Sequence, residues 1–325
     1  MHSISSVTVK KFLEKTWDFK TPLLLALSGG PDSLALFYLL KDIHPPIPFA
    51  IAHVDHGWRE KSGQEAQSIA HLAKKYGIPF HLKKLEISKD SSNLEDLCRE
   101  ARLQFFKELI KKEGYAAVLL AHHGDDQAEL ILKRIFEGAP ITTLRGMPLV
   151  VQHEDIFLWR PLLTLKKRDL EEWLNQRGKV AFQDETNLSP RFLRGRMRTS
   201  LLPFLSKEFG KEISPRLLRW GKEADELQSF IQEATAPLEK WVVRKGDEVV
   251  FDPRGNRIHP FLLKQFILQI ARTLELQLSE KGVDSAVVLL QSGAAKKEIS
   301  VSGGKVAIDR GVLRMEKCMQ KGPGL

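Results

Sequence analysis

The chain has 325 residues, of which 42% are hydrophobic, and it carries a formal net charge of +9 at pH 7. This composition excludes a disordered chain and indicates a globular protein of about two domains, given ~100–200 residues per domain. No apolar run reaches the ~18–20 residues that cross a bilayer, and the first residues lack the basic-then-apolar order of a signal peptide. We therefore expect a cytoplasmic protein outside the membrane.

The first half of the chain alternates predicted strands and helices. Apolar, β-prone runs stand at 23–27, 49–54, 80–87 and 116–121. Between them, residues 33–41 are apolar nearly all round and predict a buried helix, and a second helix opens at Asn93 and stops at Gly114. This alternation predicts an α/β fold, a doubly wound and mostly parallel sheet with helices on its faces.

The second half has a different pattern. From Leu158 the chain becomes basic and contains prolines, and residues 187–220 hold eight Lys and Arg against two Glu. Such a cluster favours a phosphate-contacting surface, with a solvated basic face as the alternative. We place a first domain at 1–213 and a smaller, mainly helical α+β domain at 214–325, with helices to about Leu278 and short strands near the end.

The two cysteines offer no site. Cys98 and Cys318 lie far apart and in no CxxC or Cys/His spacing. This spacing argues against a disulfide framework and a zinc site. Both are expected to be reduced and structural.

The segment SGGPDS is the first candidate site, because it falls between the first predicted strand and helix. Its members are Ser28, Gly29, Gly30, Pro31, Asp32 and Ser33. Ligands of open α/β sheets bind at this edge, where glycines, hydroxyls and a helix N-terminus together suit a phosphate. A carboxylate would repel phosphates without a cation, so Asp32 predicts Mg²⁺. The alternative is a plain Gly-Pro turn with an Asp cap.

Polar residues follow two other predicted strands and are expected at the same edge as Asp32. They are His53, Asp55 and His56, and then His122, His123, Asp125 and Asp126. Two adjacent carboxylates near phosphates can hold magnesium or bind an ammonium group. The histidines could instead form a transition-metal site, or pack and cap a helix at Gly124.

SGGPDS matches in full the SGGxDS signature of the PP-loop ATP pyrophosphatases, which this chain resembles. The resemblance implies that ATP adenylates a substrate and that pyrophosphate is released. Four further stretches resemble tRNA(Ile)-lysidine synthetases: AHVDHGWRE, AHHGDDQAELILKRIFEGAPITTLRGM, WRPLL and DETNLSPRFLRGRMR. Together these stretches cover about residues 23–205. Two positions depart from the family pattern, since Asp55 and Gly195 stand where Asn is usual.

The resemblance implies a ligase with three substrates. ATP, with Mg²⁺, adenylates the wobble cytidine of the isoleucine tRNA with anticodon CAU, and free L-lysine then displaces AMP. The product, lysidine, changes decoding from AUG to AUA. The C-terminal domain is expected to be a tRNA-binding accessory domain, and the sequence leaves a homodimer open.

The resemblance also implies roles for individual residues. Asp32, Asp126, Asp125 and Arg196 are the expected catalytic residues, with Asp126 favoured over Asp125 for handling the lysine amine. The six SGGPDS residues and His53 are expected to bind ATP, and Asp32 to bind Mg²⁺ through the phosphates. Arg102, His122, His123, Arg194 and Arg198 are candidates for tRNA or lysine. Because Arg194, Arg196 and Arg198 alternate, a strand or extended loop would present all three on one face, whereas a helix would spread them.

Three rival functions fit parts of the sequence. A PP-loop tRNA thiolase would need cysteines that carry sulfur, which Cys98 and Cys318 do not provide. A GMP or NAD synthetase would have no use for the basic cluster at 187–220. A non-catalytic ATP- and RNA-binding protein would have no need of Asp32 and the acid pair.

Overall fold

The computed structural model describes residues 6–57, 62–85, 94–182 and 193–318. The chain divides into two compact units, Met1–Ala224 and Asp225–Leu325, so the division falls within one helix, α9 (Ser214–Thr235). The expected domains, 1–213 and 214–325, stay a prediction. None of the helices in the described parts of the chain has the length and apolarity that a membrane span requires.

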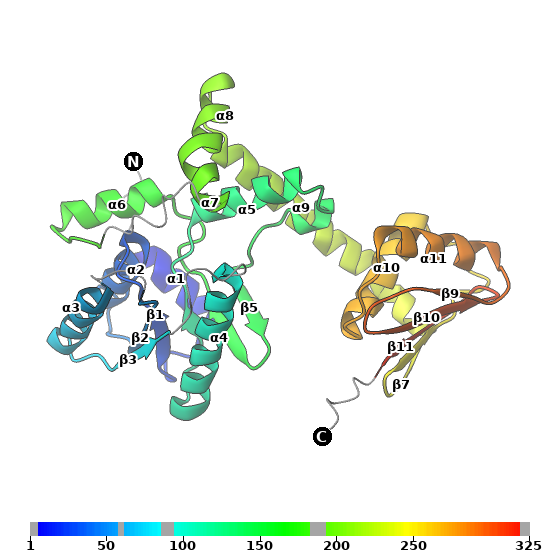
Figure 1. The fold of residues 1–325 in the computed structure, drawn as a ribbon, viewed down its shortest axis with the longest axis horizontal. Coiled ribbons are helices and arrows are strands. Elements are labelled where there is room, and N and C mark those ends of the chain that lie inside the picture. Colours follow the sequence, from blue (N-terminus) through cyan, green and yellow to red (C-terminus); the bar gives the residue numbers. More distant parts are fainter. Residues whose placement is uncertain (1–5, 58–61, 86–93, 183–192, 319–325) are drawn as a thin grey trace. The chain divides into compact units, whose positions relative to one another are not determined.

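Unit 1 is built on a six-stranded sheet with strand order β3-β2-β1-β4-β6-β5 (Figure 1). The strands are β1 (Leu23–Ala26), β2 (Phe49–Asp55), β3 (Phe80–Lys84), β4 (Val118–Leu119), β5 (Val150–His153) and β6 (Ile156–Trp159). All neighbours are parallel except β5, which pairs antiparallel with β6 at one edge. The order runs outward from β1 in one direction and then continues from β4 in the other. A ligand crevice is expected at this reversal, at the carboxyl ends of the strands.

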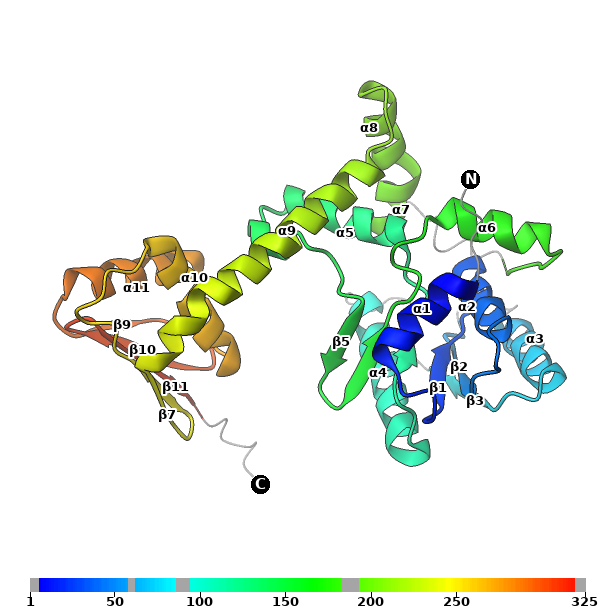
Figure 2. The same ribbon diagram turned by 180° about the vertical axis from the view of Figure 1, so that it is seen from behind.

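Helices cover both faces of this sheet (Figure 2). The helices within residues 6–235 are α1 (Ser6–Thr16), α2 (Pro31–Lys41), α3 (Ser62–Lys75), α4 (Leu94–Glu113), α5 (Gly124–Phe136), α6 (Lys167–Gln176), α7 (Leu193–Arg196), a π-helix (Met197–Leu201), α8 (Leu202–Glu208) and α9, with a 3₁₀ turn at Ile141–Thr143. Side chains alternate along β1: Leu23 and Leu25 join the core formed with α1, α2, α3 and α6, and Leu24 packs with α4. The doubly wound fold class is confirmed.

The predicted helices agree with the structure apart from their ends. Helix α2 begins at Pro31 and buries most of its residues, as its all-round apolarity predicts. Helix α4 stops before Gly114, whose φ of +75° suits glycine. Its predicted start, Asn93, lies outside the described residues. The helix predicts an apolar face that contains Leu94, Leu97 and Cys98, of which Leu94 and Cys98 are buried and Leu97 is 41% exposed.

Unit 2 contains an antiparallel sheet with order β7-β8-β11-β10-β9 and helices α10 (Pro260–Thr273) and α11 (Glu280–Ser292). Its strands are β7 (Val242–Lys245), β8 (Glu248–Phe251), β9 (Lys297–Ile299), β10 (Gly304–Asp309) and β11 (Val312–Lys317), and a 3₁₀ turn spans Ala236–Trp241. The expectation of helices alone up to Leu278 was wrong, since the hairpin β7–β8 lies there. Valine-rich runs flank Gly246, whose φ of +57° forms the turn.

Candidate active site

The loop between β1 and α2 is organised by the hydroxyl of Ser33. This buried oxygen accepts hydrogen bonds from the backbone N–H groups of Ser28 at 3.2 Å and Gly29 at 3.1 Å. It donates to the carbonyl of Gly30 at 3.0 Å. Ser28, Gly30, Pro31, Asp32 and Ser33 line a cavity of about 770 Å³. The predicted phosphate loop therefore borders an open cavity at the N-terminus of α2.

Gly29 is the residue of this loop whose backbone requires glycine. Its φ is +88°, and a Cβ added there would lie 2.2 Å from Cδ2 of Phe182. We expect Gly29→Ala to lower the free energy of unfolding by about 2 kcal/mol or more, from backbone strain and overpacking. Gly30 has a φ of −68° and 3.6 Å of clearance. Gly30→Ala is therefore the matched control in denaturant unfolding, with an expected loss of about 0.5 kcal/mol, and equal losses would contradict the assignment.

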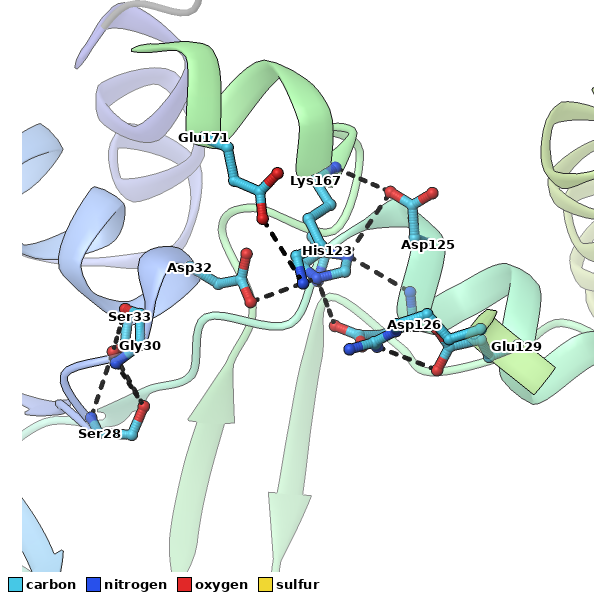
Figure 3. A network of polar contacts seen from close by, with 11 residues as sticks. Ser28, Gly30, Asp32, Ser33, His123, Asp125, Asp126, Glu129, Lys167 and Glu171 are labelled. Carbon is cyan, nitrogen blue, oxygen red and sulfur yellow. Dashed lines mark hydrogen bonds and ion pairs between the residues drawn. The ribbon is translucent and has the colours of Figure 1, made fainter. Parts of the chain in front are cut away.

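His123 lies at the centre of the polar network beside this loop (Figure 3). It caps α5, and its side chain is 1% exposed. Its Nε2 lies 3.5 Å from Oδ2 of Asp32 and 3.4 Å from Oδ2 of Asp126, and its Nδ1 lies 3.7 Å from Oδ2 of Asp125. Burial opposes the charged ring, but the contact with Asp32 and the three carboxylate charges outweigh it and raise the pKa of His123. The structure thus confirms that a histidine caps this helix, and that Asp125 and Asp126 lie near Asp32, whereas Asp55 instead accepts the backbone N–H of Gly57 at 2.9 Å.

The two carboxylate oxygens of Asp32 have different surroundings, because one contacts the protein and the other is available to a ligand. Burial would raise its pKa, but His123 and the charges of Lys167 and Arg198 lower it, so the carboxylate is held in its charged form. Oδ2 faces His123, whereas Oδ1 is buried at the cavity and has no hydrogen-bond partner among the described residues. A buried carboxylate oxygen without a donor fits a Mg²⁺ ion that is shared with phosphates.

Asp125 and Asp126, although adjacent, have different environments. Asp126 lines the cavity, and its Oδ2 accepts a hydrogen bond from the backbone N–H of His123 at 3.0 Å. The Oδ2 of Asp125 instead accepts the backbone N–H of Lys167 at 2.8 Å, at the start of α6. Asp125 therefore links the first turn of α5 to the first residue of α6. Asp126 is the member of the pair that faces the cavity.

Glu129 is a site residue that the sequence patterns did not single out. It is 3% exposed, and its Oε1 lies 2.6 Å from Nε of Arg198, whose Nη2 also lies 2.9 Å from Oδ1 of Asp126. Burial raises the pKa of Glu129, and the guanidinium of Arg198 partly offsets this. The signal was the helical spacing of Asp126 and Glu129, which places both carboxylates on one face of α5.

The alternating arginines are helical, the second of the two conformations that the sequence left open. Arg194 and Arg196 lie in α7 and are exposed, and Arg198 follows in the π-helix and is half-buried at the cavity. A helix turns alternate positions away from one another. Arg198 therefore joins the carboxylates and Arg196 does not share its direction, whereas Arg194, one helical turn before Arg198, is exposed and does not line the cavity. The predicted contacts of all three with tRNA or ATP stay predictions.

His53 and Arg102, two further predicted site residues, lie differently. The ring of His53 is buried, its Nδ1 lies 2.8 Å from the carbonyl of Leu27, and burial lowers its pKa. The neighbours Ala52 and Val54 line the cavity, and His53 does not. Its predicted contact with ATP stays a prediction. Arg102, on α4, lines the cavity.

His122 lines the cavity and is held by Arg160, a second residue that the sequence did not single out. Nε of Arg160 donates to Nδ1 of His122 at 3.3 Å, which leaves the ring proton on Nε2. Burial lowers the pKa of His122 to about 4; Asp126 raises it and the neighbouring arginines lower it. His122 is therefore a neutral donor near pH 7. The signal for Arg160 was its place in WRPLL, directly after a strand of the same sheet.

This low pKa predicts an acid-dependent loss of stability. Between pH 6.5 and about 4 the unfolded chain protonates His122 while the folded chain does not, so stability falls as the pH drops through this window. The expected contribution is about 3 kcal/mol. His122→Asn keeps an acceptor for Arg160 and should remove this loss in unfolding measured from pH 7 to 4. His71→Asn, an exposed position on α3, should behave like the unchanged chain.

Two charged residues of α6 complete the cavity wall. Lys167 and Glu171 line the cavity and lie 3.6 Å apart, Nζ to Oε1. They belong to the basic stretch after WRPLL, where charge alone did not distinguish a site from a solvated face. Within the described ranges, no group of three or more His, Cys, Asp and Glu residues has the geometry of a metal site. The transition-metal alternative therefore gains no support.

Comparison with known proteins agrees with this geometry. The family model of the PP-loop domain matches residues 1–205. The tRNA(Ile)-lysidine synthase of Protochlamydia amoebophila is 36% identical over 323 residues, 98% of this chain and 70% of the relative. That of Chlamydia trachomatis serovar L2 is 45% identical over 223 residues, 68% of this chain and 69% of the relative. The solved U34-tRNA thiolase NcsA from Methanococcus maripaludis has a TM-score of 0.55 at 18% identity, covers 68% of this chain and 78% of its own, and is alike in fold alone.

The reversal of strand order, the SGGPDS loop and the matched domain define a PP-loop protein, a class that uses ATP. The sequence identity of the curated relatives, and the share of the chain that they cover, narrow this class to one family. The chain belongs to the tRNA(Ile)-lysidine synthase family. The predicted family, fold class and ligase class are confirmed.

Proposed function

We propose that this protein ligates free L-lysine to the wobble cytidine of the CAU-anticodon isoleucine tRNA in the cytoplasm, at the expense of ATP. The observation that carries the proposal is the convergence of Asp32, Asp126 and His122 on one cavity beside the SGGPDS loop. Family membership supports the tRNA substrate and the use of ATP. The carboxylate of Asp126, which faces the cavity, supports a substrate with an ammonium group.

The first step joins the cytidine to AMP. The carbonyl oxygen of cytosine attacks the α-phosphorus of ATP, the bond to the β-phosphate oxygen breaks, and pyrophosphate leaves. The loop and the N-terminus of α2 bind the phosphates, and Oδ1 of Asp32 would hold Mg²⁺. When bound, Mg²⁺ offsets the negative charge of the phosphates. His123 holds the other oxygen of Asp32, so the carboxylate keeps its orientation.

The second step joins lysine to the ring. The side-chain amine of lysine attacks the ring carbon, the carbon–oxygen bond breaks, and AMP leaves with the oxygen. An amine of ordinary pKa about 10.4 is protonated at pH 7. Asp126 accepts its proton as attack proceeds, because the carboxylate of Asp126 lines the cavity and that of Asp125 does not.

The test is mass analysis of nucleosides from transcribed isoleucine tRNA treated with the protein, ATP and lysine. We expect one cytidine to be replaced by its lysine-substituted form, and pyrophosphate release to require the tRNA. Pyrophosphate release that ignores tRNA, or tRNA that stays unmodified, would contradict the proposal. A methionine tRNA with the same anticodon is the matched substrate control, and it should stay unmodified.

A further inference from the structure

Arg160 is a buried arginine that stands behind His122, because His122 lines the catalytic cavity and Arg160 does not. It is 8% exposed and directly follows β6. Its Nε donates to Nδ1 of His122 at 3.3 Å, and its Nη1 donates to the carbonyl of Pro148 at 2.9 Å. Within the parts of the chain that the structure describes, Arg160 pairs with no carboxylate. Burying a guanidinium without an anion is costly, so an apolar side chain would serve a purely structural role better.

The backbone fixes the positions of Arg160 and His122. The N–H of Arg160 donates to the carbonyl of Leu149 at 2.9 Å, and the N–H of Leu120 donates to the carbonyl of Trp159 at 2.8 Å. Leu120 stands two residues before His122 and follows β4, which pairs with β6. The hydrogen bond between the two side chains therefore joins two segments that are already held together.

The hydrogen bond from Arg160 determines which groups His122 can bind. A guanidinium only donates, so Nδ1 of His122 accepts and the ring proton lies on Nε2. Burial lowers the pKa of His122 to about 4, so the ring is neutral near pH 7. Because Arg160 occupies Nδ1, Nε2–H is the group left for a ligand in the cavity. The ammonium group of lysine has only donors, so it cannot be the partner of His122.

The α-phosphate of ATP supplies the acceptor that this donor needs. His122 is close enough to Asp126, proposed above to take the proton of lysine, to feel its charge. Its chain neighbour His123 contacts Asp32, the carboxylate proposed to share Mg²⁺ with the phosphates. His122 therefore lies next to the part of the site where the phosphates and the cytosine ring must meet. A hydrogen bond to the cytosine oxygen would weaken that oxygen as a nucleophile, whereas one to the α-phosphate assists the attack.

We propose that Arg160 is a positioning residue, which holds His122 so that its Nε2–H donates to a non-bridging oxygen of the α-phosphate. The inference rests on the proposed function and deepens it. In the first step the cytosine oxygen binds the α-phosphorus and the bond to the pyrophosphate oxygen breaks, and the non-bridging oxygens carry charge of the transition state. In the second step the carbon–oxygen bond breaks and AMP keeps the electron pair. The ring proton stays on His122 in both steps, and its hydrogen bond stabilises this charge.

The test is a double-mutant cycle of Arg160 and His122, with the rate of pyrophosphate release as the readout. Arg160→Met removes both hydrogen bonds and keeps an unbranched side chain. Partners that orient a metal-binding histidine cost about 10–100-fold when removed, and we expect a loss of this size in kcat, with the KM for ATP little changed. His122→Asn keeps an acceptor for Arg160 but has no donor in place of Nε2. In its background Arg160→Met should change kcat by at most about twofold, because Arg160 acts through His122.

Arg134→Met is the matched control. This half-buried arginine also donates to backbone carbonyls, those of Thr143 and Gly146, and it does not line the cavity. Any effect of Arg134→Met on kcat should be the same with and without His122. Arg160→Lys keeps a donor and should retain most of the rate. If the losses of Arg160→Met and His122→Asn multiply in the double variant, Arg160 supports only the fold and the inference is overturned.

NMR spectroscopy reports the tautomer of His122 directly. Correlations between the ring nitrogens and the carbon-bound protons, assigned with His122→Asn, should show Nε2 protonated and Nδ1 unprotonated in the unchanged protein. In Arg160→Met both tautomers should be populated. A protonated Nδ1 in the unchanged protein would overturn the inference, also where Arg160→Met does not fold.

The acceptor is identified with ATP that carries sulfur in place of one non-bridging oxygen of the α-phosphate, because sulfur is a weak acceptor. One of the two diastereomers should slow pyrophosphate release in the unchanged protein, and His122→Asn should lose most of this slowing. Equal slowing in both proteins would overturn the inference and leave the proposed function standing. If the unchanged protein makes no lysidine from ordinary ATP, the proposed function is wrong and the inference falls with it.

Discussion

Asp32→Asn is expected to lower the rate of pyrophosphate release by roughly 10³-fold, while tRNA binding persists. The substitution keeps the size of the side chain and removes the negative charge that Oδ1 presents to the cavity. Without this charge the side chain no longer attracts a cation that would share the phosphates. The candidates for tRNA contact, Arg102 and Arg194, lie on α4 and α7 and not on α2, so tRNA binding is expected to survive.

The control for Asp32→Asn is Asp42→Asn. Asp42 follows the other end of α2, and its carboxylate lies 3.8 Å from Arg177 at the surface. It should retain full release, and thermal unfolding should show that both variants are folded. Equal loss of pyrophosphate release and of salt-sensitive tRNA binding in Asp32→Asn would mean that Asp32 supports the fold of the whole site instead of the phosphates.

The position of the phosphate site could be predicted because it depends on local order. An apolar strand, a polar gap and an apolar helix define SGGPDS, and the parallel sheet places it with the residues that follow β2 and β4. The alternation of side chains along β2 also predicts where His53 points. His53 and Ile51 are two positions apart, so they lie on the same face of the strand, and Ile51 packs in the core with α2 and α3. An alternating strand therefore turns His53 away from the face of Ala52 and Val54 that borders the cavity.

The partners of Arg198 could not be predicted, because they lie 69 and 72 positions away in the chain. Alternate spacing fits a strand, and only the packing of Met197 and Leu202 against α5 fixes this segment as a helix. The contact between Arg160 and His122 could not be predicted either. WRPLL places it after a strand, but its contact with His122 depends on β4 and β6 being neighbours.

Asp126→Asn should separate the two chemical steps. The amide keeps the size of the side chain and one acceptor, which can serve either Arg198 or the backbone N–H of His123 but not both, because the carboxylate uses a different oxygen for each. The amide cannot take a proton from the amine of lysine. Pyrophosphate release should therefore continue to about one turnover per tRNA, while lysidine formation falls by roughly 10²–10⁴-fold. Quench-flow measurement of pyrophosphate, adenylated tRNA and lysidine follows both steps.

Asp125→Asn is the matched control, one residue away in the same helical turn. Its carboxylate accepts the N–H of Lys167, a bond that an amide oxygen can also accept, so the second step should change little. Lysidine formation by Asp126→Asn should also recover as the pH rises toward 10.4, because more lysine is then deprotonated without help. Misplacement of the site would give no such recovery. If Asp125→Asn is the variant that loses the second step and regains it at high pH, the two carboxylates have their roles exchanged.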